Sequence, residues 1–270
     1  MGKIADKTLI EMVKIKPGTF TMSRPVGHLV CNADEEIPHR VTIERPYLMG
    51  KFPVTQDEFK AVMQHNPSHF SVENGVPAAA GEIQGRRPVD CVSFYNAIMF
   101  CNKLSILEGL SPVYIIKGSK NPEKWGNVPL HKSEAWDAVI ADGSADGYRL
   151  PTEEQWEYAC MDAAINEGWH ADNSGGKTHQ TGIFAPNANG LYDMLGNVFE
   201  ICWSTPKLCD LVLPGLEASD PHPIIYRVLR GGGWRSKPQI LCAAYQLHAV
   251  PWKTGTDYGF RVVRGADEKE

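Results

Sequence analysis

The chain has 270 residues, of which 43% are hydrophobic and 22% charged, and its formal net charge is −5 at pH 7. This length and composition suit a globular protein with a substantial buried core. The acidic balance and the lack of a basic block argue against nucleic-acid binding, which needs concentrated positive charge.

Short strands are expected near both ends of the chain. Residues 10–22 and 39–50 place β-branched and aromatic residues in near-alternation around turn signals, a pattern typical of antiparallel strands. Residues 226–232 and 259–265 alternate in the same way. We therefore predict that strands open and close the fold.

Three helices are predicted between these strands, at residues 54–64, 92–107 and 150–165. Each segment carries apolar residues at helical spacing and starts with a side chain that can cap the first turn. The capping residues are Thr55, Ser93 and Thr152.

Long stretches outside these elements are rich in Gly, Pro, Asn and Asp, notably residues 110–147 and 166–225. Such stretches indicate function or a fold that tolerates much coil. No internal repeat or low-complexity linker divides the chain. We predict one α+β domain over residues 1–270, with short antiparallel strands, about three helices and much irregular coil.

The seven cysteines are an odd number and include no CxxC pair. Cys202 and Cys209 could form a disulfide, but most of the cysteines fit better as small buried hydrophobic residues. No apolar run approaches the roughly 20 residues of a transmembrane segment, and residues 1–18 lack the apolar stretch of a secretory signal.

Seven sequence blocks follow one another between residues 12 and 264: MVKIKPGTFTM, PHRVTIERPYLMGKFPVTQDEFKAVM, RPVDCVSFYNAIMFCNKLS, GYRLPTEEQWEYAC, NGLYDMLGNVFEICWS, RVLRGGGW and GFRVVR. In this order they resemble the formylglycine-generating-enzyme (sulfatase-modifying factor) family. The resemblance implies an elaborated C-type lectin fold. It does not settle function, because the family includes copper oxidases, iron-dependent sulfoxide synthases, silent paralogues and retroelement-diversified variable proteins.

The copper oxidases of this family hold their metal with two cysteines that follow the glycine-rich turn. In this chain the first position falls on Ser236 and the second on Leu241 or Cys242. The block LCAAY is similar to a structural strand of the family, which places Cys242 in the core. A two-thiolate site is therefore not expected.

The iron-dependent branch carries an HxxxHxE signature. His65 and His69 have the right separation, but the glutamate is Glu73, two positions late. An Asn-Pro pair also interrupts the helix on which the two histidines would face one metal. No catalytic residue is predicted from either metal pattern.

Residues 187–200 resemble the calcium-binding region of the family. Asn197, Glu200 and a backbone carbonyl could supply oxygens to a structural calcium ion. The alternative is a turn at Asn197 and a hydrogen-bonded Glu200. No cofactor is required in this interpretation.

The variable-protein branch resembles this chain at its C-terminal anchors, RGGxW, CAAY and GFRVVR. In that branch a retroelement rewrites the final coding segment while the scaffold stays fixed. We therefore expect a non-enzymatic protein that binds a ligand through a variable segment at about residues 234–258. The predicted ligand-binding residues are Arg235, Ser236, Pro238, Ile240, Leu247, His248, Val250, Trp252, Thr254, Thr256, Asp257 and Tyr258.

The variable-protein hypothesis makes further predictions about single positions. Trp234 and Phe260 should be buried, whereas Arg235, His248 and Trp252 should be exposed. A randomised codon that ends in a fixed pyrimidine cannot encode Trp, Lys, Gln, Met or Glu, so six residues of the segment should be scaffold or come from other codons. These residues are Trp234, Lys237, Gln239, Gln246, Trp252 and Lys253.

The partner expected from this hypothesis is a protein or another cell-surface molecule, not a nucleic acid. Display on a bacterial surface is expected if an export or anchor segment was removed from the N-terminus. The alternative hypotheses are a metal-dependent oxidase or sulfoxide synthase with an unusual site, and a silent paralogue that serves as a partner subunit.

Overall fold

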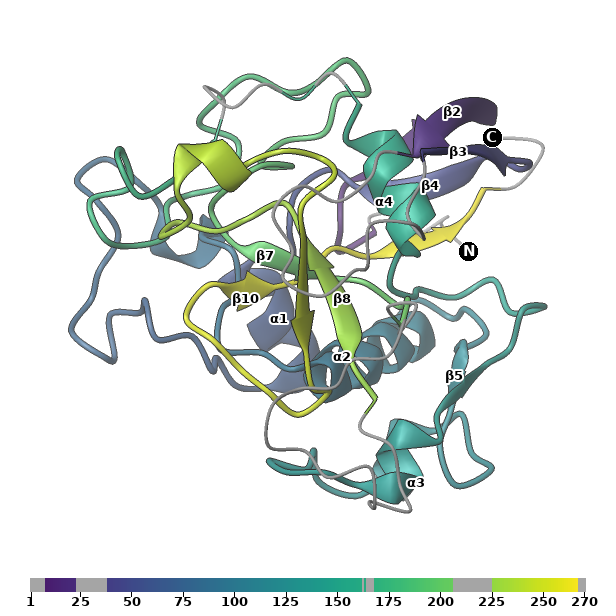
Figure 1. The fold of residues 1–270 in the computed structure, drawn as a ribbon. Coiled ribbons are helices and arrows are strands. Elements are labelled where there is room, and N and C mark those ends of the chain that lie inside the picture. The colour runs from purple at the N-terminus through teal and green to yellow at the C-terminus, as the bar shows by residue number, and fades with distance from the viewer. Residues whose placement is uncertain (1–7, 23–37, 162, 164–167, 206–224, 267–270) are drawn as a thin grey trace, which may run out of the picture.

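The computed structural model describes residues 8–22, 38–161, 163, 168–205 and 225–266. These residues form short strands and helices joined by long irregular segments (Figure 1). The α+β class and the abundance of coil predicted from the sequence are confirmed. Within these ranges no helix is long and apolar enough to cross a membrane.

The first sheet joins the two ends of the chain. It consists of β1 (Met12–Ile15), β4 (Tyr47–Gly50) and β11 (Val263–Gly265), with the antiparallel β4 in the centre. All four residues of β4 are buried, since the strand has a neighbour on each side and packs on both faces. The predicted terminal strands are confirmed here.

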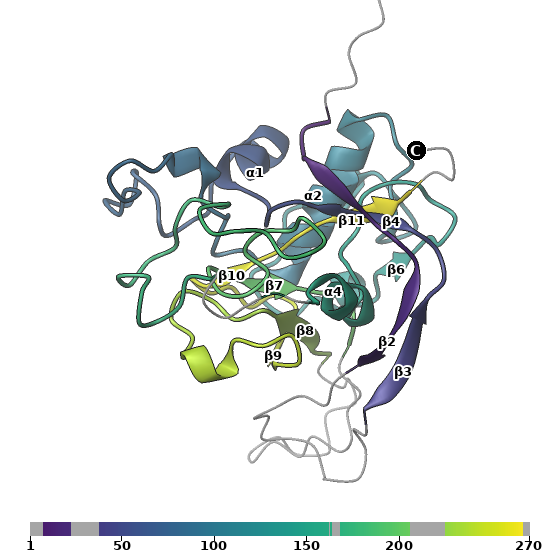
Figure 2. The ribbon, with the colours of Figure 1, turned by 90° about the horizontal axis from the view of Figure 1, so that it is seen from above.

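The second sheet has four strands in the order β10 (Tyr258–Gly259), β7 (Phe199–Ile201), β8 (Arg227–Arg230) and β9 (Gln246–Ala249). β10 runs parallel to β7, and the other pairs are antiparallel. Figure 2 shows β8 and β9 on the opposite side of the molecule from α1. The segment that joins β8 to β9 therefore begins and ends on the side of the molecule opposite α1.

Two smaller pairs complete the strands. β2 (Gly18–Met22) and β3 (His39–Ile43) pair over five residues and form a long ribbon along one side of the molecule (Figure 2). β5 (Tyr114–Ile115) pairs with β6 (Ile140–Ala141).

The three predicted helices are present as α1 (Gln56–Met63), α2 (Phe94–Leu107) and α4 (Glu153–Ala159). Thr55, Ser93 and Thr152 are the N-caps as predicted, and each takes part in a capping box. The side-chain oxygens satisfy backbone N–H groups that the first turn leaves free.

α4 ends six residues before the predicted boundary at residue 165. Its final carbonyl, on Ala159, accepts hydrogen bonds from the side-chain amides of Asn187 at 2.7 Å and Asn189 at 3.1 Å. A continuing helix would use this carbonyl for its own backbone, so two distant asparagines replace the next turn. The short helix α3 (Glu134–Asp137) was not predicted. Single 3₁₀ turns occur at η1 (Gln84–Arg86), η2 (Pro122–Lys124) and η4 (Pro238–Ile240).

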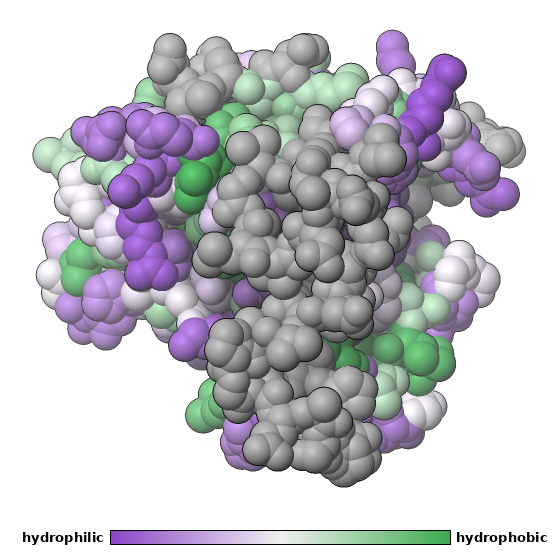
Figure 3. Space-filling view, viewed as in Figure 1, coloured by the Kyte–Doolittle hydropathy of each residue, from purple (hydrophilic) through white to green (hydrophobic). Residues whose placement is uncertain are grey.

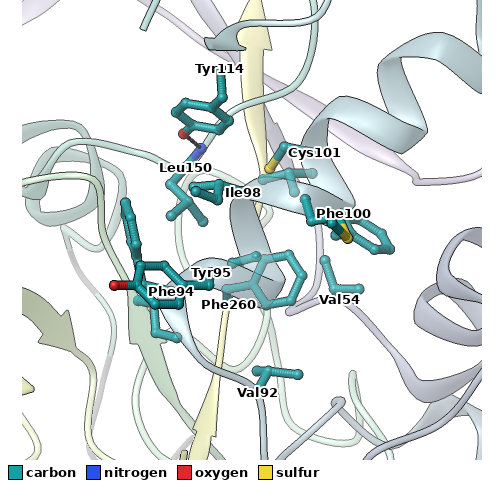
Figure 4. Close-up of a cluster of buried hydrophobic side chains, with 14 of the residues drawn as sticks. Val54, Val92, Phe94, Tyr95, Ile98, Phe100, Cys101, Tyr114, Leu150 and Phe260 are labelled. Carbon is teal, nitrogen blue, oxygen red and sulfur yellow. Dashed lines mark hydrogen bonds between the residues drawn. The ribbon is translucent and has the colours of Figure 1, made fainter. Parts of the chain in front are cut away.

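The main core surrounds α2 (Figure 4). Phe100 is fully buried, stacks on Phe59 at 5.6 Å between ring centroids and meets Phe260 edge-on at 5.2 Å. Such aromatic pairs add stabilisation beyond the area they bury. Phe260, expected to be buried, is therefore the residue that ties the chain's C-terminal part to α1 and α2.

Candidate ligand-binding surface

The segment 234–258 leaves the second sheet after β8 and returns to it at β10. Two glycines make the exit, Gly231 with φ 88° and Gly232 with φ 77°. A Cβ on Gly231 would lie 2.7 Å from the Met194 carbonyl oxygen, and one on Gly232 would lie 2.3 Å from Leu241. The glycine-rich turn is therefore required by both backbone conformation and packing.

The backbone of this segment is held to the scaffold at its start. The amide of Trp234 donates to the Asn197 carbonyl at 2.8 Å, and the Trp234 carbonyl accepts from the Ser174 hydroxyl at 2.8 Å. The Ser236 carbonyl accepts from the amide of Ala171 at 2.9 Å. These bonds fix the backbone and leave the neighbouring side chains free to differ.

The end of the segment is held in a similar way. The Gly255 carbonyl accepts from the Cys91 amide at 3.0 Å, and the Asp257 carbonyl accepts from the Phe199 amide at 2.7 Å. The indole N–H of Trp234 also donates to the Thr256 carbonyl at 3.0 Å, which links the two ends directly. We call residues 234–258, held in this way, the 234–258 surface.

The predicted ligand-binding residues differ in exposure. Arg235 and Thr254 are exposed. A larger group is half-buried, namely Pro238, Ile240, Leu247, His248, Val250, Trp252, Thr256 and Tyr258. Figure 3 shows hydrophilic residues gathered at the upper left of the face, where Figure 1 draws η4.

Ser236 and Asp257 do not face solvent as ligand-binding residues would. Ser236 is 6% exposed, and its hydroxyl accepts from the Gly233 amide at 2.9 Å. Asp257 is 2% exposed. Both side chains stabilise the local backbone or a neighbouring side chain, so in this conformation neither offers contact area to a ligand.

Three single-position predictions were wrong in degree. Trp234, expected to be buried, is half-buried: its ring contacts Phe70 edge-on with the ring centroids 5.3 Å apart, and its indole N–H bonds the Thr256 carbonyl. Trp252 and His248, expected to be exposed, are also half-buried. Trp252 packs against the main core, which covers part of its indole. Arg235 is exposed as predicted.

Cys242 does not lie in a core strand, contrary to the expectation. The residue is half-buried and sits in a turn between η4 and β9, which begins only at Gln246. The strand starts later because the amide of Tyr245 donates back to the Cys242 carbonyl at 3.2 Å, closing a turn across the LCAAY block.

Arg235 and Asp257 form a bidentate pair across the 234–258 surface. Nε of Arg235 donates to Oδ2 of Asp257 at 2.7 Å, and Nη2 donates to Oδ1 at 2.9 Å. The hydrogen bonds that Arg235 donates to Asp257 raise the pKa of Arg235 above its ordinary value. The pair holds one exposed guanidinium in a fixed orientation, as bidentate pairs do.

Cys91 lies beside the surface but is not a reactive thiol. Burial, with the nearby charge of Asp90, raises the pKa of Cys91 to about 12. The group therefore stays protonated at neutral pH and is a poor nucleophile.

Three exposed residues of the 234–258 surface were assigned to the scaffold by codon reasoning: Lys237, Gln239 and Lys253. Their polarity within a Pro- and Gly-containing coil is the sequence signal for exposure. Codon limits describe how a residue can arise and carry no information about where its side chain points.

The residues of the proposed calcium region are already engaged with protein partners. Glu200 accepts from Arg261 and, at 2.7 Å, from the indole of Trp156. The Asn197 side chain bonds the amide and the carbonyl of His179 and also donates to Asp193. These two side chains do not fit an open cation site, because their oxygens already accept hydrogen bonds.

The residues considered as iron or copper ligands do not form a metal site among the described residues. His65 and His69 lie beyond the end of α1, and both are exposed. In the described ranges, no group of three or more His, Cys, Asp or Glu side chains is arranged to hold a metal. Cys209, considered as a disulfide partner of Cys202, lies outside these ranges, and Cys202 is a buried free thiol.

Fold and surface together define an α+β protein of the formylglycine-generating-enzyme type, consistent with a C-type-lectin-like fold. A family model described as "Sulfatase-modifying factor enzyme 1-like domain" matches residues 1–266. The chain belongs to this FGE-sulfatase family.

Proteins with quite different names are similar to this chain. The solved structure of Treponema denticola variable protein 1 superposes with a TM-score of 0.77 at 33% identity, over 94% of this chain and 95% of that one. The "Chaperone protein LppX" of Paenibacillus barcinonensis is 31% identical over 81% of this chain and 80% of its own length. The chain spans only 38% of the serine/threonine-protein kinase pkn1 of Chlamydia pneumoniae, at 26% identity over 95% of this chain.

Proposed function

We propose that this chain is a non-enzymatic, retroelement-diversified variable protein that binds a protein or other cell-surface ligand through the 234–258 surface. One observation carries the proposal. Backbone hydrogen bonds hold both ends of the segment to the scaffold, while side chains such as Arg235, Lys237 and Lys253 are exposed. A fixed backbone with replaceable side chains is what a diversified binding site needs. The similarity to the Treponema denticola variable protein supports this function.

The binding capacity of the surface can be tested with two matched libraries. One library randomises exposed positions of the surface, Lys237, Gln239, Lys253 and Thr254. The other randomises equally exposed positions elsewhere: Lys16, Thr19, Arg40 and Lys60. Both are displayed on yeast and selected against one purified target protein.

We expect most members of the first library to fold and some to bind the target. The control library should fold but yield few binders, because its positions do not share one face. Loss of folding in the first library, or equal enrichment from both, would contradict the proposal.

Diversification itself is tested in the DNA that flanks the coding sequence. A near-identical template repeat of the 3′ coding end and a neighbouring reverse-transcriptase gene are expected. If neither is present, the retroelement part of the proposal fails, although the binding part would remain testable.

The non-enzymatic part of the proposal is tested with the purified protein loaded with Cu(I) or Fe(II). We expect no oxidation of a cysteine-containing sulfatase peptide and no sulfoxide formation. Turnover that is lost in Cys242→Ala or His65→Ala would establish an enzyme instead.

We also propose display on a bacterial surface, as the function requires access to an external ligand. Antibodies against the purified chain should label intact cells of the source organism. Labelling that appears only after lysis would contradict this.

A further inference from the structure

Arg227, the first residue of β8, is a buried cation between aromatic rings. It is 6% exposed. The guanidinium carbon lies 4.0 Å from the ring centroid of Phe94 and 5.0 Å from that of Trp203. Nη1 donates to the Trp203 carbonyl at 2.7 Å. These contacts orient the guanidinium but do not neutralise its charge.

No carboxylate of the described residues forms an ion pair with Arg227, and its Nε–H is buried without a hydrogen-bond acceptor. Burial lowers the pKa of Arg227 to about 10, against smaller opposing effects from Tyr114 and Asp137. A buried charge is normally paired, because desolvation without a partner is costly. The missing anion therefore needs an explanation.

Two other buried arginines show what pairing looks like in this protein. Arg230 lies three residues further along β8 and contacts Glu153 at 3.2 Å and Glu157 at 3.1 Å. Arg261 pairs with Glu200 at 2.8 Å. Arg227 is slightly more accessible than these two fully buried arginines, and it lines a small pocket.

This pocket has a volume of about 10 Å³ and is lined by Arg227, Lys253 and Tyr258 together with apolar residues that include Phe94 and Val250. It has room for one water-sized group. Val250 and Tyr258 belong to the 234–258 surface, and Lys253 is exposed. A buried arginine and an exposed lysine thus line the same small space.

The charge of the surrounding surface has the same sign. Segment 234–258 exposes Arg235, Lys237 and Lys253 and buries one acid, Asp257. Because Asp257 pairs with Arg235, the excess positive charge of the segment comes from the two lysines. The chain as a whole carries a net charge of −5. A local cationic face on an acidic protein favours approach by an acidic group.

We propose that the Arg227 pocket receives one oxygen of a carboxylate, supplied by an aspartate or glutamate side chain of the protein ligand. The Nε–H of Arg227 donates to this oxygen, and Lys253 pairs with the other. That the carboxylate belongs to a protein ligand rests on the function proposed above. That the pocket binds a carboxylate does not depend on that function.

The test follows the Nε–Hε signal of Arg227 by NMR, with the signal assigned by its loss in Arg227→Lys. N-acetyl-aspartate N-methylamide is titrated at constant ionic strength, and N-acetyl-asparagine N-methylamide is the neutral control. We expect a saturable shift with the acid and none with the amide. No saturable shift, equal shifts with both compounds, or an equal shift with chloride would overturn the proposal.

Two lysine variants keep the test decisive if Arg227→Lys does not fold. Lys253→Ala should weaken binding of the acid at least threefold, whereas Lys237→Ala, an exposed lysine outside the pocket lining, should leave it unchanged. If both variants weaken binding of the acid equally, the binding depends only on the overall positive charge of the surface, and the proposed site is wrong. If the acid binds here but the randomised surface yields no binders, the pocket is supported and the proposed function fails. If the surface yields binders but the acid does not bind, the proposed function is supported and the pocket fails.

Discussion

Arg235 and Asp257 show how a single residue on the 234–258 surface depends on another. The Arg235 side chain is 56% exposed, whereas that of Asp257 is 3% exposed. An exposed arginine can be replaced at little cost, but here its loss would leave a buried carboxylate without a counter-charge. The two positions are therefore coupled, even though 22 residues separate them in sequence.

We expect Arg235→Ala to lower the free energy of unfolding by about 1–3 kcal/mol, because Asp257 loses both hydrogen bonds. The double variant Arg235→Ala/Asp257→Asn should recover part of this loss, since no buried charge remains. Urea unfolding at pH 7 measures both. With Asp257→Asn as the second single variant, a double-variant loss equal to the sum of the two single losses would show that the residues are not coupled.

Two buried carboxyl groups make stability depend on pH. Burial raises the pKa of Asp90 and of Asp193 to about 6. Asp90 accepts a hydrogen bond from the His69 amide at 2.8 Å, and Asp193 accepts one from the Gly182 amide at 2.8 Å. These hydrogen bonds lower the two pKa values, but by less than burial raises them. The folded protein therefore binds protons more tightly at these sites than the unfolded chain does.

Stability should consequently fall as the pH rises from about 4 to about 6, by up to about 1.4 kcal/mol per pH unit for each group. The contribution is complete below the unfolded pKa and lost above the folded one. Asp90→Asn and Asp193→Asn should each reduce this slope. Unfolding by guanidinium chloride at four pH values tests the prediction, and an unchanged slope in both variants would refute it.

At the scale of the element, α4 carries several side chains that join it to the second sheet. Trp156 donates to Glu200 of β7, and Glu153 accepts from Arg230 of β8 and from Gln246 of β9. A helix of seven residues is too short to be stable alone, so its cap and these contacts hold it in place.

Thr152→Ala should therefore lower the free energy of unfolding by about 1 kcal/mol, because the amide of Gln155 loses its acceptor. Thr254→Ala is the matched control, since Thr254 is exposed and outside any helix start, and it should change stability by less than about 0.5 kcal/mol. Thermal unfolding of the two variants side by side distinguishes a capping effect from the loss of a threonine as such.

At the scale of the molecule, Arg261 connects three distant parts of the chain. Its guanidinium donates to the Gly50 carbonyl at 2.7 Å, to the Tyr192 carbonyl at 2.7 Å and to Glu200. Both members of the ion pair are buried. The pair thereby joins β4 of the first sheet to β7 of the second.

Glu200→Gln should lower the free energy of unfolding by about 3–5 kcal/mol, since Arg261 would keep its charge without a partner. Glu11→Gln makes the same chemical change in the surface pair with Lys51, where Glu11 is 62% exposed, and should cost under about 1 kcal/mol. Similar losses in both variants would show that the buried pair has no special role in joining the sheets.

The sequence by itself determined the local elements and the family. The N-caps Thr55, Ser93 and Thr152 act on a backbone N–H three residues further on, so the starts of α1, α2 and α4 could be predicted without the fold. The alternating strands near both ends are local patterns of the same kind. The glycine-rich turn before the 234–258 surface is equally local.

Only the tertiary structure decided where α4 ends, which predicted ligand-binding residues face inward, and what Glu200 contacts. Asn187 ends α4, Asp257 is buried against Arg235, and Glu200 pairs with Arg261. Each outcome depends on a partner at least 22 residues away, and Arg227 beside Phe94 is a further case. Burial and charge pairing depend on neighbours that long-range folding supplies, whereas caps, turns and alternation depend on adjacent residues.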